Sequence, residues 1–107
     1  MKITEIETHA VGAEWKNWLF VKVQTDSGVH GIAEATINGF ITTTETAIHE
    51  LAHFVIGKDS CQVNAVANAV ISPIADVGHI HRMVMGAIEV ACWDILGKSL
   101  GAPIWHC

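Results

Sequence analysis

The segment MVMGAIEVACWDIL, from Met83 to Leu96, limits what this chain can fold into more than any other stretch. Read as a helix, it is apolar on nearly every side, and Glu89 and Asp94 are its only charged residues. A helix that is hydrophobic all round must be buried all round. A chain of 107 residues can cover one or two sides of such a helix. The helix therefore lies at the centre of a small bundle, or its main partner lies outside the chain.

The composition favours an outside partner. The length of 107 residues corresponds to one domain, yet 50% of the residues are hydrophobic and only 16% are charged. An ordinary soluble domain has roughly 25% charged residues, so the apolar surplus indicates an interface. The formal net charge is −5, and Lys and Arg form no cluster. Nucleic acid and anionic membranes are therefore not the expected partners.

Three features of the sequence indicate the cellular compartment in which the protein is expected. Its first residues, MKITEIETHA, lack the apolar region of a signal peptide. No apolar run reaches the roughly 18 residues of a membrane-spanning helix. Cys61, Cys92 and Cys107 are an odd number at wide spacing, which predicts neither a disulfide framework nor a zinc site. We expect buried thiols in a cytoplasmic protein.

Alternating apolar and polar residues predict three strands at the start of the chain. The first, Met1 to Val11, alternates imperfectly, whereas the second, Trp18 to Thr25, alternates throughout. One face of the second strand carries Leu19, Val21, Val23 and Thr25, and the other carries Trp18, Phe20, Lys22 and Gln24. A tight hairpin at Asp26-Ser27-Gly28 leads to a third strand, Val29 to Ala35, which Gly31 weakens. The three strands form an antiparallel meander.

After Thr36 the apolar residues recur with a helical period. Thr42 and Glu45 are spaced as a capping box at the start of a first helix. The apolar stripe of this helix runs to Val55, and Gly57 ends it. The sequence therefore predicts a first helix between the capping box and Gly57.

Two further helices follow. Asp59 or Ser60 caps the second, whose apolar stripe ends before Pro73. The third runs from about His79 to Leu100 and is closed by a glycine and a following proline. The predicted order is three strands followed by three helices, an α+β fold with one sheet and one helical layer.

One loop groups residues that are suited to binding. Trp15, Lys16, Asn17 and Trp18 bring two indoles, a cation and an amide together within four positions. Loops of this kind carry binding function on rigid scaffolds. Two simpler interpretations stay open: Trp18 packs as the first residue of its strand, and Lys16 is only solvated.

The histidines and Glu34 are weaker candidates. His49-Glu50-Leu51-Ala52-His53 matches the HExxH pattern of zinc enzymes. No clear third ligand follows it, and the positions also suit the solvated face of an amphipathic helix. His79 and His81 lie on different faces of a helix. Glu34, at the end of the third strand, is a sheet-edge charge unless a second acid or base lies beside it.

Four stretches together resemble a known family. KITEIETHAVG, NWLFVKVQTDSGVHGIAEAT, IGKD and GAIEVACWDILGKSLGAPIW, in this order and spacing, are similar to the N-terminal capping domain of the enolase superfamily, in its mandelate racemase and muconate-lactonising branch. The resemblance covers essentially the whole chain. It implies an enolase-like N-terminal domain over residues 1–107, without the catalytic (β/α) barrel.

The resemblance also implies a function. In this family the capping domain closes over a barrel, and two of its loops determine which acid sugar or related carboxylate fits. The barrel supplies a magnesium ion and the bases that remove the proton next to the carboxylate, so the resemblance implies no catalytic residue and no cofactor in this chain. The loops correspond to about Val11 to Trp18 and about Ile37 to Thr43, and the second adds Asn38 to the expected substrate contacts. The resemblance thus implies the substrate-capping domain of a magnesium-dependent acid-sugar dehydratase or racemase, which is expected to be inactive without the barrel.

Two alternatives remain at this point. The chain is a non-catalytic module that self-associates through its apolar helix, or it is a small zinc-binding protein that uses His49 and His53. In the first interpretation its partner is a second copy of itself, whereas the resemblance implies a barrel domain as the partner and a small carboxylate as the ligand. Sedimentation and metal analysis separate these alternatives.

Overall fold

The computed structural model describes residues 1–12, 17–36, 41–71 and 79–101, without the side chains of residues 17, 70, 71 and 79–81. The elements follow in the order β1 (Ile3–Gly12), β2 (Asn17–Thr25), β3 (His30–Glu34), α1 (Ile41–Ala52), α2 (Val63–Ile71) and α3 (His79–Leu100). The predicted α+β order of three strands and three helices is confirmed.

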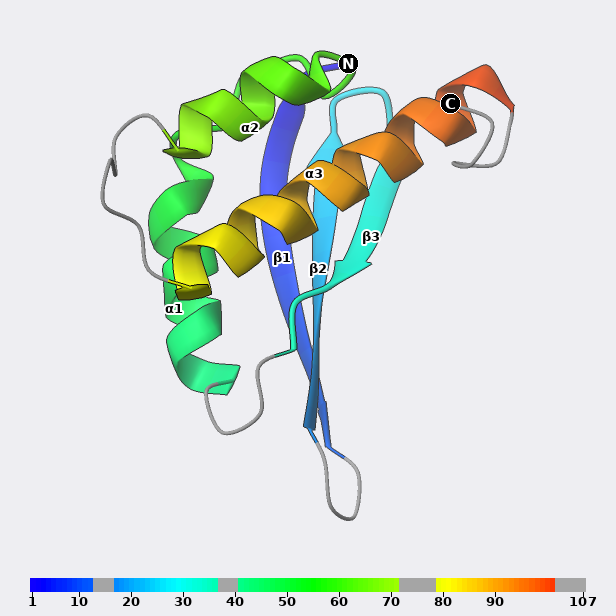
Figure 1. Cartoon of the computed structure of the whole chain (residues 1–107). Coiled ribbons are helices and arrows are strands. Elements are labelled where there is room, and N and C mark those ends of the chain that lie inside the picture. Colours follow the sequence, from blue (N-terminus) through cyan, green and yellow to red (C-terminus); the bar gives the residue numbers. More distant parts are fainter. Residues whose placement is uncertain (13–16, 37–40, 72–78, 102–107) are drawn as a thin grey trace.

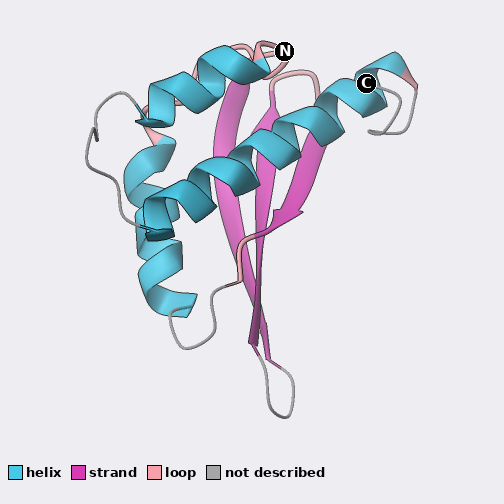
Figure 2. Cartoon of the chain, in the orientation of Figure 1, coloured by secondary structure: helices cyan, strands magenta, loops and turns pink. Residues whose placement is uncertain are grey.

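The strands form one antiparallel sheet in the order β1-β2-β3. The helices lie on one face of this sheet, and the other face is open (Figures 1 and 2). The predicted alternation of β2 decides which side chains face the helices: Leu19, Val21 and Val23 are completely buried. Phe20 and Lys22 point to the open face and are half-buried. The core therefore lies between the sheet and the helical layer.

A bulge explains the imperfect alternation of β1. Ile3 is paired with Thr25, whereas Glu5 is paired with Gln24, so the register shifts between Ile3 and Glu5. An extra residue in one strand reverses the facing of the residues that follow it. Ile3 and Ile6 are consequently both buried although three positions separate them.

α3 passes so close to β3 that Gly31 is required. A Cβ atom at Gly31 would overlap the carbonyl group of Ala91 and would lie 2.9 Å from Cγ1 of Ile95. Glycine in a strand often marks a place where another backbone approaches closely. The residue that weakens the sequence pattern of the third strand is therefore the one that allows α3 to pack against it.

α3 buries one side within the chain. Its buried residues are Val84, Ala87, Ile88, Ala91, Cys92 and Ile95. On another side Val90 is 48% exposed and Leu100 is 66% exposed. The remaining chain thus covers only part of the all-round apolar helix.

The helix starts differ from the predicted ones. α1 begins at Ile41, so Thr42 lies inside its first turn rather than at the N-cap, and Glu45 accepts a hydrogen bond from Thr8 of β1. Neither Asp59 nor Ser60 caps α2, which begins at Val63. These errors arise because the side chains have other partners: Asp59 accepts from the nearby amide of Cys61 and pairs with the N-terminal ammonium of Met1, and Ser60 donates to the carbonyl of Met1.

The predicted helix stops at Gly57 and Gly101 can be compared with the structure, whereas Pro73 and Pro103 lie outside the described residues. α1 ends at Ala52, but hydrogen-bonded turns continue from it and bury Val55 completely. Gly57 follows with a φ of 86°, and Gly101 after α3 has a φ of 68°. Glycine reaches this left-handed region without the steric cost of a Cβ.

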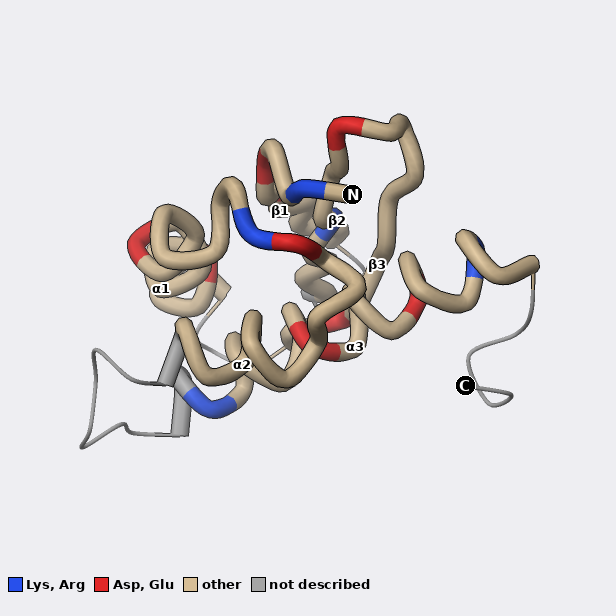
Figure 3. Tube along the Cα trace, turned by 90° about the horizontal axis from the view of Figure 1, so that it is seen from above, with Lys and Arg blue, Asp and Glu red and all other residues tan. Residues whose placement is uncertain are grey.

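Charge is spread thinly over the described surface. Figure 3 shows Lys and Arg scattered over the elements rather than gathered on one face. Among the described residues, no helix combines the length and apolar character needed to cross a membrane.

Candidate functional site

In the sequence, the predicted binding residues fall between β1 and β2, at the start of β2, and between β3 and α1. Trp15, Lys16 and Asn38 lie outside the described residues, and Asn17 opens β2 with its side chain outside the description. Trp18 is half-buried and is paired with Val11 in the sheet. Figure 1 shows the far ends of β1 and β2 projecting beyond the helices, and α1 beginning on the same side.

The strand end before residues 37–40 is attached to β2. The amide of Ala35 donates to the carbonyl of Leu19 at 2.8 Å, and the amide of Leu19 donates to Oγ1 of Thr36 at 3.1 Å. Leu19 lies two residues after Asn17, where β2 begins. The chain that leads into the second predicted loop is therefore fixed beside the strand that leaves the first.

The helix after residues 37–40 is attached to β1. Oγ1 of Thr8 donates to Oε2 of Glu45 at 2.8 Å, and Nε2 of His49 lies 3.1 Å from the same hydroxyl. All the described stems of the two predicted loops thus meet at one end of the domain. Sequence reasoning missed Thr8, because nothing in its own segment indicates a partner some 40 positions away.

The described residues do not assemble a metal centre. Among residues 1–12, 17–36, 41–71 and 79–101, no three His, Cys, Asp or Glu side chains converge. His49 contacts Thr8, and the ring of His53 packs against Phe54 with centroids 4.4 Å apart. The HExxH match therefore acquires no third ligand within the described part of the chain.

Glu34 keeps the simpler interpretation. It is the last residue of β3, it is exposed, and it faces Phe20 across the sheet. A general acid or base needs a second group within hydrogen-bonding reach of the reacting atoms. Within the part of the chain that the structure describes, Glu34 has no such partner, and we assign it no chemical role.

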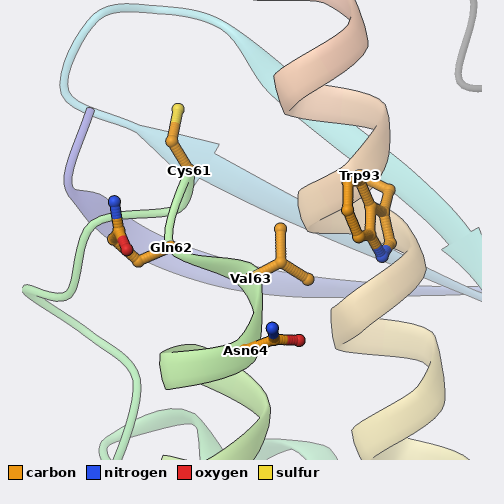
Figure 4. A pocket seen from close by; sticks show the side chains of 5 residues that line it. All are labelled: Cys61, Gln62, Val63, Asn64 and Trp93. Atoms are coloured by element: carbon orange, nitrogen blue, oxygen red, sulfur yellow. The ribbon is translucent and has the colours of Figure 1, made fainter. Parts of the chain in front are cut away.

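A shallow hollow lies between the start of α2 and the middle of α3 (Figure 4). It has a volume of about 180 Å³ and is lined by Cys61, Gln62, Val63, Asn64 and Trp93. The segment before α2 is bonded to Met1, so the hollow lies towards the N-terminus rather than at the loop stems. No sequence pattern predicted it.

Cys92 is not a nucleophile at neutral pH. Burial raises the pKa of its thiol to about 12, and Cys61 and Glu89 add smaller effects in the same direction. The thiolate is the reactive form of cysteine. The expectation of a buried thiol is confirmed for Cys92, while Cys61 is half-buried.

Comparisons with known proteins agree with one another. The chain is 38% identical over 107 residues to D-galactonate dehydratase of Xanthomonas campestris pv. campestris, covering 99% of this chain and 27% of that protein. A crystal structure of an enolase from Pantoea ananatis with bound D-gluconate and Mg has a TM-score of 0.88 and 28% identity, over 98% of this chain and 26% of that one.

A more distant structure shows the fold alone. An enolase from Agrobacterium radiobacter, with bound Na and L-malate, has a TM-score of 0.92 and 20% identity, over 99% of this chain and 27% of that one. The chain thus spans about a quarter of the length of the relatives it matches.

The resemblance stated from the sequence is confirmed over nearly the whole length. The family model of the mandelate racemase / muconate lactonizing enzyme N-terminal domain matches residues 4–107. The strand and helix order of that domain is the one described above. The chain belongs to the mandelate racemase / muconate lactonizing enzyme N-terminal domain family.

Proposed function

We propose that this chain is the substrate-capping domain of an acid-sugar dehydratase, and that a (β/α) barrel supplies the rest of the enzyme. The observation that carries the proposal is the match of the whole chain to the first part of proteins named D-galactonate dehydratase, at 38% identity. The meeting of the loop stems at one end of the domain supports it, because a cap acts through loops on one side.

Five residues are proposed as substrate contacts: Trp15, Lys16, Asn17, Trp18 and Asn38. An acid sugar offers a carboxylate, several hydroxyl groups and an apolar ring or chain face. The Lys16 ammonium suits the carboxylate, and the two amides suit hydroxyl groups. The two indoles supply flat apolar surfaces with one polar N–H each. The residue types therefore match the chemistry of this class of ligand.

The chemical step is proposed to lie outside this chain. Magnesium in the wider family would stabilise the negative charge that develops when the proton next to the carboxylate leaves. The described residues do not fit this ion, because no three potential ligands converge among them. The work of the cap is to orient the substrate and to exclude water from it.

A fusion enzyme tests the substrate contacts. Residues 1–107 would replace the matching first part of the Xanthomonas campestris D-galactonate dehydratase, and Lys16→Ala and Asn38→Ala would be made in the fusion. We expect KM for D-galactonate to rise about tenfold with a smaller change in kcat, since each change removes a binding interaction. Lys58→Ala, an exposed lysine beyond α1, is the matched control.

Two outcomes would contradict these contacts. One is that neither loop variant changes KM or substrate preference. The other is that Lys58→Ala changes them as much as Lys16→Ala does. Either outcome would remove the loop residues from the proposal, although the family membership of the chain would stand.

Self-association is the second candidate function. Val90 and Leu100 of α3 are 48% and 66% exposed, and exposed apolar surface of this kind favours a partner. Sedimentation of the isolated chain separates the two functions. A stable dimer that Val90→Ser disrupts favours the self-associating module, whereas a monomer that binds a hydrophobic dye favours a cap without its barrel.

A further inference from the structure

The hydroxyl of Thr8 makes two hydrogen bonds that fix each other's direction. It donates to Oε2 of Glu45 at 2.8 Å, and Nε2 of His49 lies 3.1 Å from the same oxygen. A hydroxyl has one proton to give and two lone pairs that accept. Because Glu45 takes the proton, the contact with His49 is a hydrogen bond only if Nε2 carries a proton and donates it. The geometry therefore assigns a proton to Nε2 of His49.

This network joins the stems of the two loops. Thr8 lies four residues before Gly12, the last residue of β1. Glu45 lies four residues after Ile41, the first residue of α1. The bonds from Thr8 span 37 and 41 positions of the sequence. One hydroxyl thus connects the strand that enters residues 13–16 with the helix that leaves residues 37–40.

Directional bonds are needed because the buried side chains of α1 are mainly apolar. The apolar ones are Ala47, Ile48 and Leu51, and Thr44 is the one buried polar residue among the described side chains of the helix. Apolar burial is non-directional, so it tolerates a small shift of the helix along the sheet. Hydrogen bonds weaken steeply when their angles change. The Thr8 bonds therefore oppose a shift of α1 that the apolar contacts permit.

The chain before residues 37–40 is fixed separately. Thr36 and Ala35 are bonded to Leu19 of β2. The chain before residues 37–40 is thus fixed to β2, and the helix after them is fixed to β1. Both attachments are therefore made to the same pair of strands, which we call the frame. His49, which the HExxH pattern suggested as a metal ligand, has a structural role in this frame.

We propose that Thr8, Glu45 and His49 form a positioning device that sets the separation between the end of β1, before residues 13–16, and the start of α1, after residues 37–40. The meaning of this separation rests on the proposed function, in which both loops contact the substrate. The device itself is a property of the isolated chain. It can therefore be tested without catalysis, so that its failure and the failure of the proposed function are distinguishable.

The first test is nitrogen NMR of the histidine rings at a pH where the rings are neutral. We expect a proton on Nε2 of His49, and we expect the Nε2 resonance to move in Thr8→Val but to remain in place in Thr8→Ser. The ring of His53, which packs on Phe54, is the internal control. A proton on Nδ1 of His49 instead would overturn the proposal, and this measurement needs only the unchanged chain.

The second test measures the separation directly. Spin labels at Ala10→Cys and Thr43→Cys, both exposed positions, would report distances between β1 and the start of α1, with Cys61 and Cys107 changed to serine. Losing one hydrogen bond shifts an equilibrium about fivefold. In Thr8→Val we therefore expect the population outside the main distance peak to rise about fivefold.

Two variants control this measurement. Thr8→Ser keeps the hydroxyl and should keep the distance distribution, and Thr4→Val repeats the substitution at an exposed position of the same strand. An unchanged distribution in Thr8→Val would overturn the proposal. So would equal broadening in Thr4→Val, because the effect would then be a general loss of stability. If Thr8→Val does not fold, Glu45→Ala removes the acceptor and has the same expected result.

Discussion

At the scale of single residues, the contact between Gly31 and α3 is the most demanding. A Cβ at Gly31 would meet the Ala91 carbonyl carbon at 2.8 Å, and backbone atoms cannot move aside as a flexible side chain can. We expect Gly31→Ala to lower the free energy of unfolding by about 2–3 kcal/mol. Urea unfolding measures this change.

Gly86 supplies a control of opposite sign. It lies inside α3, and a Cβ there has no heavy atom within 4 Å. Gly86→Ala should therefore raise the free energy of unfolding by roughly 0.5–1 kcal/mol, because alanine favours the helix. Equal effects of the two substitutions would show that the close approach of α3 to β3 is wrong.

The buried thiol of Cys92 makes the free energy of unfolding depend on pH in the alkaline range. Burial raises the pKa of this thiol to about 12 in the folded chain, from an ordinary value of 9.0. The unfolded chain therefore loses this proton first. The contribution of Cys92 is fully present below pH 9 and falls as the pH rises towards 12, by about 1.4 kcal/mol per pH unit.

Urea unfolding at pH 9 and pH 10.5 tests this dependence. Between these two pH values, the free energy of unfolding of the unchanged chain should fall by about 2 kcal/mol more than that of Cys92→Ala. Cys61→Ala, which removes the half-buried thiol, should keep most of the loss. Parallel pH profiles for the unchanged chain and Cys92→Ala would contradict the burial of this thiol.

At the scale of elements, α3 closes the free edge of β3 with two side chains. The amide of Ile32 donates to Oδ2 of Asp94 at 3.1 Å, and Nζ of Lys98 donates to the carbonyl of His30 at 2.8 Å. Asp94 and Lys98 also pair with each other at 3.1 Å. Open strand edges invite pairing with other chains, so these residues of the WDILGKSLG segment protect the sheet.

Hydrogen exchange tests this edge closure. In Asp94→Ala we expect the amide of Ile32 to exchange about tenfold faster, since a hydrogen bond to a charged acceptor is lost. The amide of Ala35, bonded to Leu19, should be unaffected. Ser99→Ala, in which an intrahelical bond of α3 is lost, is the control variant. No change at Ile32 would contradict the role of Asp94.

At the scale of the whole molecule, the sequence was sufficient for the element order and for the faces of β2. Both depend on local periodicity, which Leu19, Val21 and Val23 express directly. It was not sufficient for the roles of Glu45, Asp59 and Ser60, because Glu45 bonds Thr8 and the other two contact Met1, partners that are adjacent only after folding. Local capping rules cannot anticipate such long-range competition.

The candidate site likewise has features that the sequence predicted and long-range bonds that it did not. The binding loop at Trp15 to Trp18 was identified from residue type, and the second loop, with Asn38, followed from the family resemblance. The tie at Thr8 and the link between Thr36 and Leu19 were not predictable, since neither residue has a local pattern that names its partner. These long-range bonds hold the stems of the two loops at one end of the domain.

α3 is only partly buried by the rest of the described chain. The all-round apolar helix has one side against β3, β2 and α2, while Val90 and Leu100 remain exposed. The relatives are about four times longer than this chain, since it spans 27% of them. We propose that their remaining length supplies the missing cover. We likewise propose that this chain contributes to substrate fit and that the barrel carries out the chemical step.

The most direct test of this division is an activity measurement on two proteins. The isolated chain and its fusion to the Xanthomonas campestris D-galactonate dehydratase barrel would each be given D-galactonate with magnesium. We expect no turnover by the isolated chain and measurable turnover by the fusion. Turnover by the isolated chain that a substitution within residues 1–107 abolishes would contradict it.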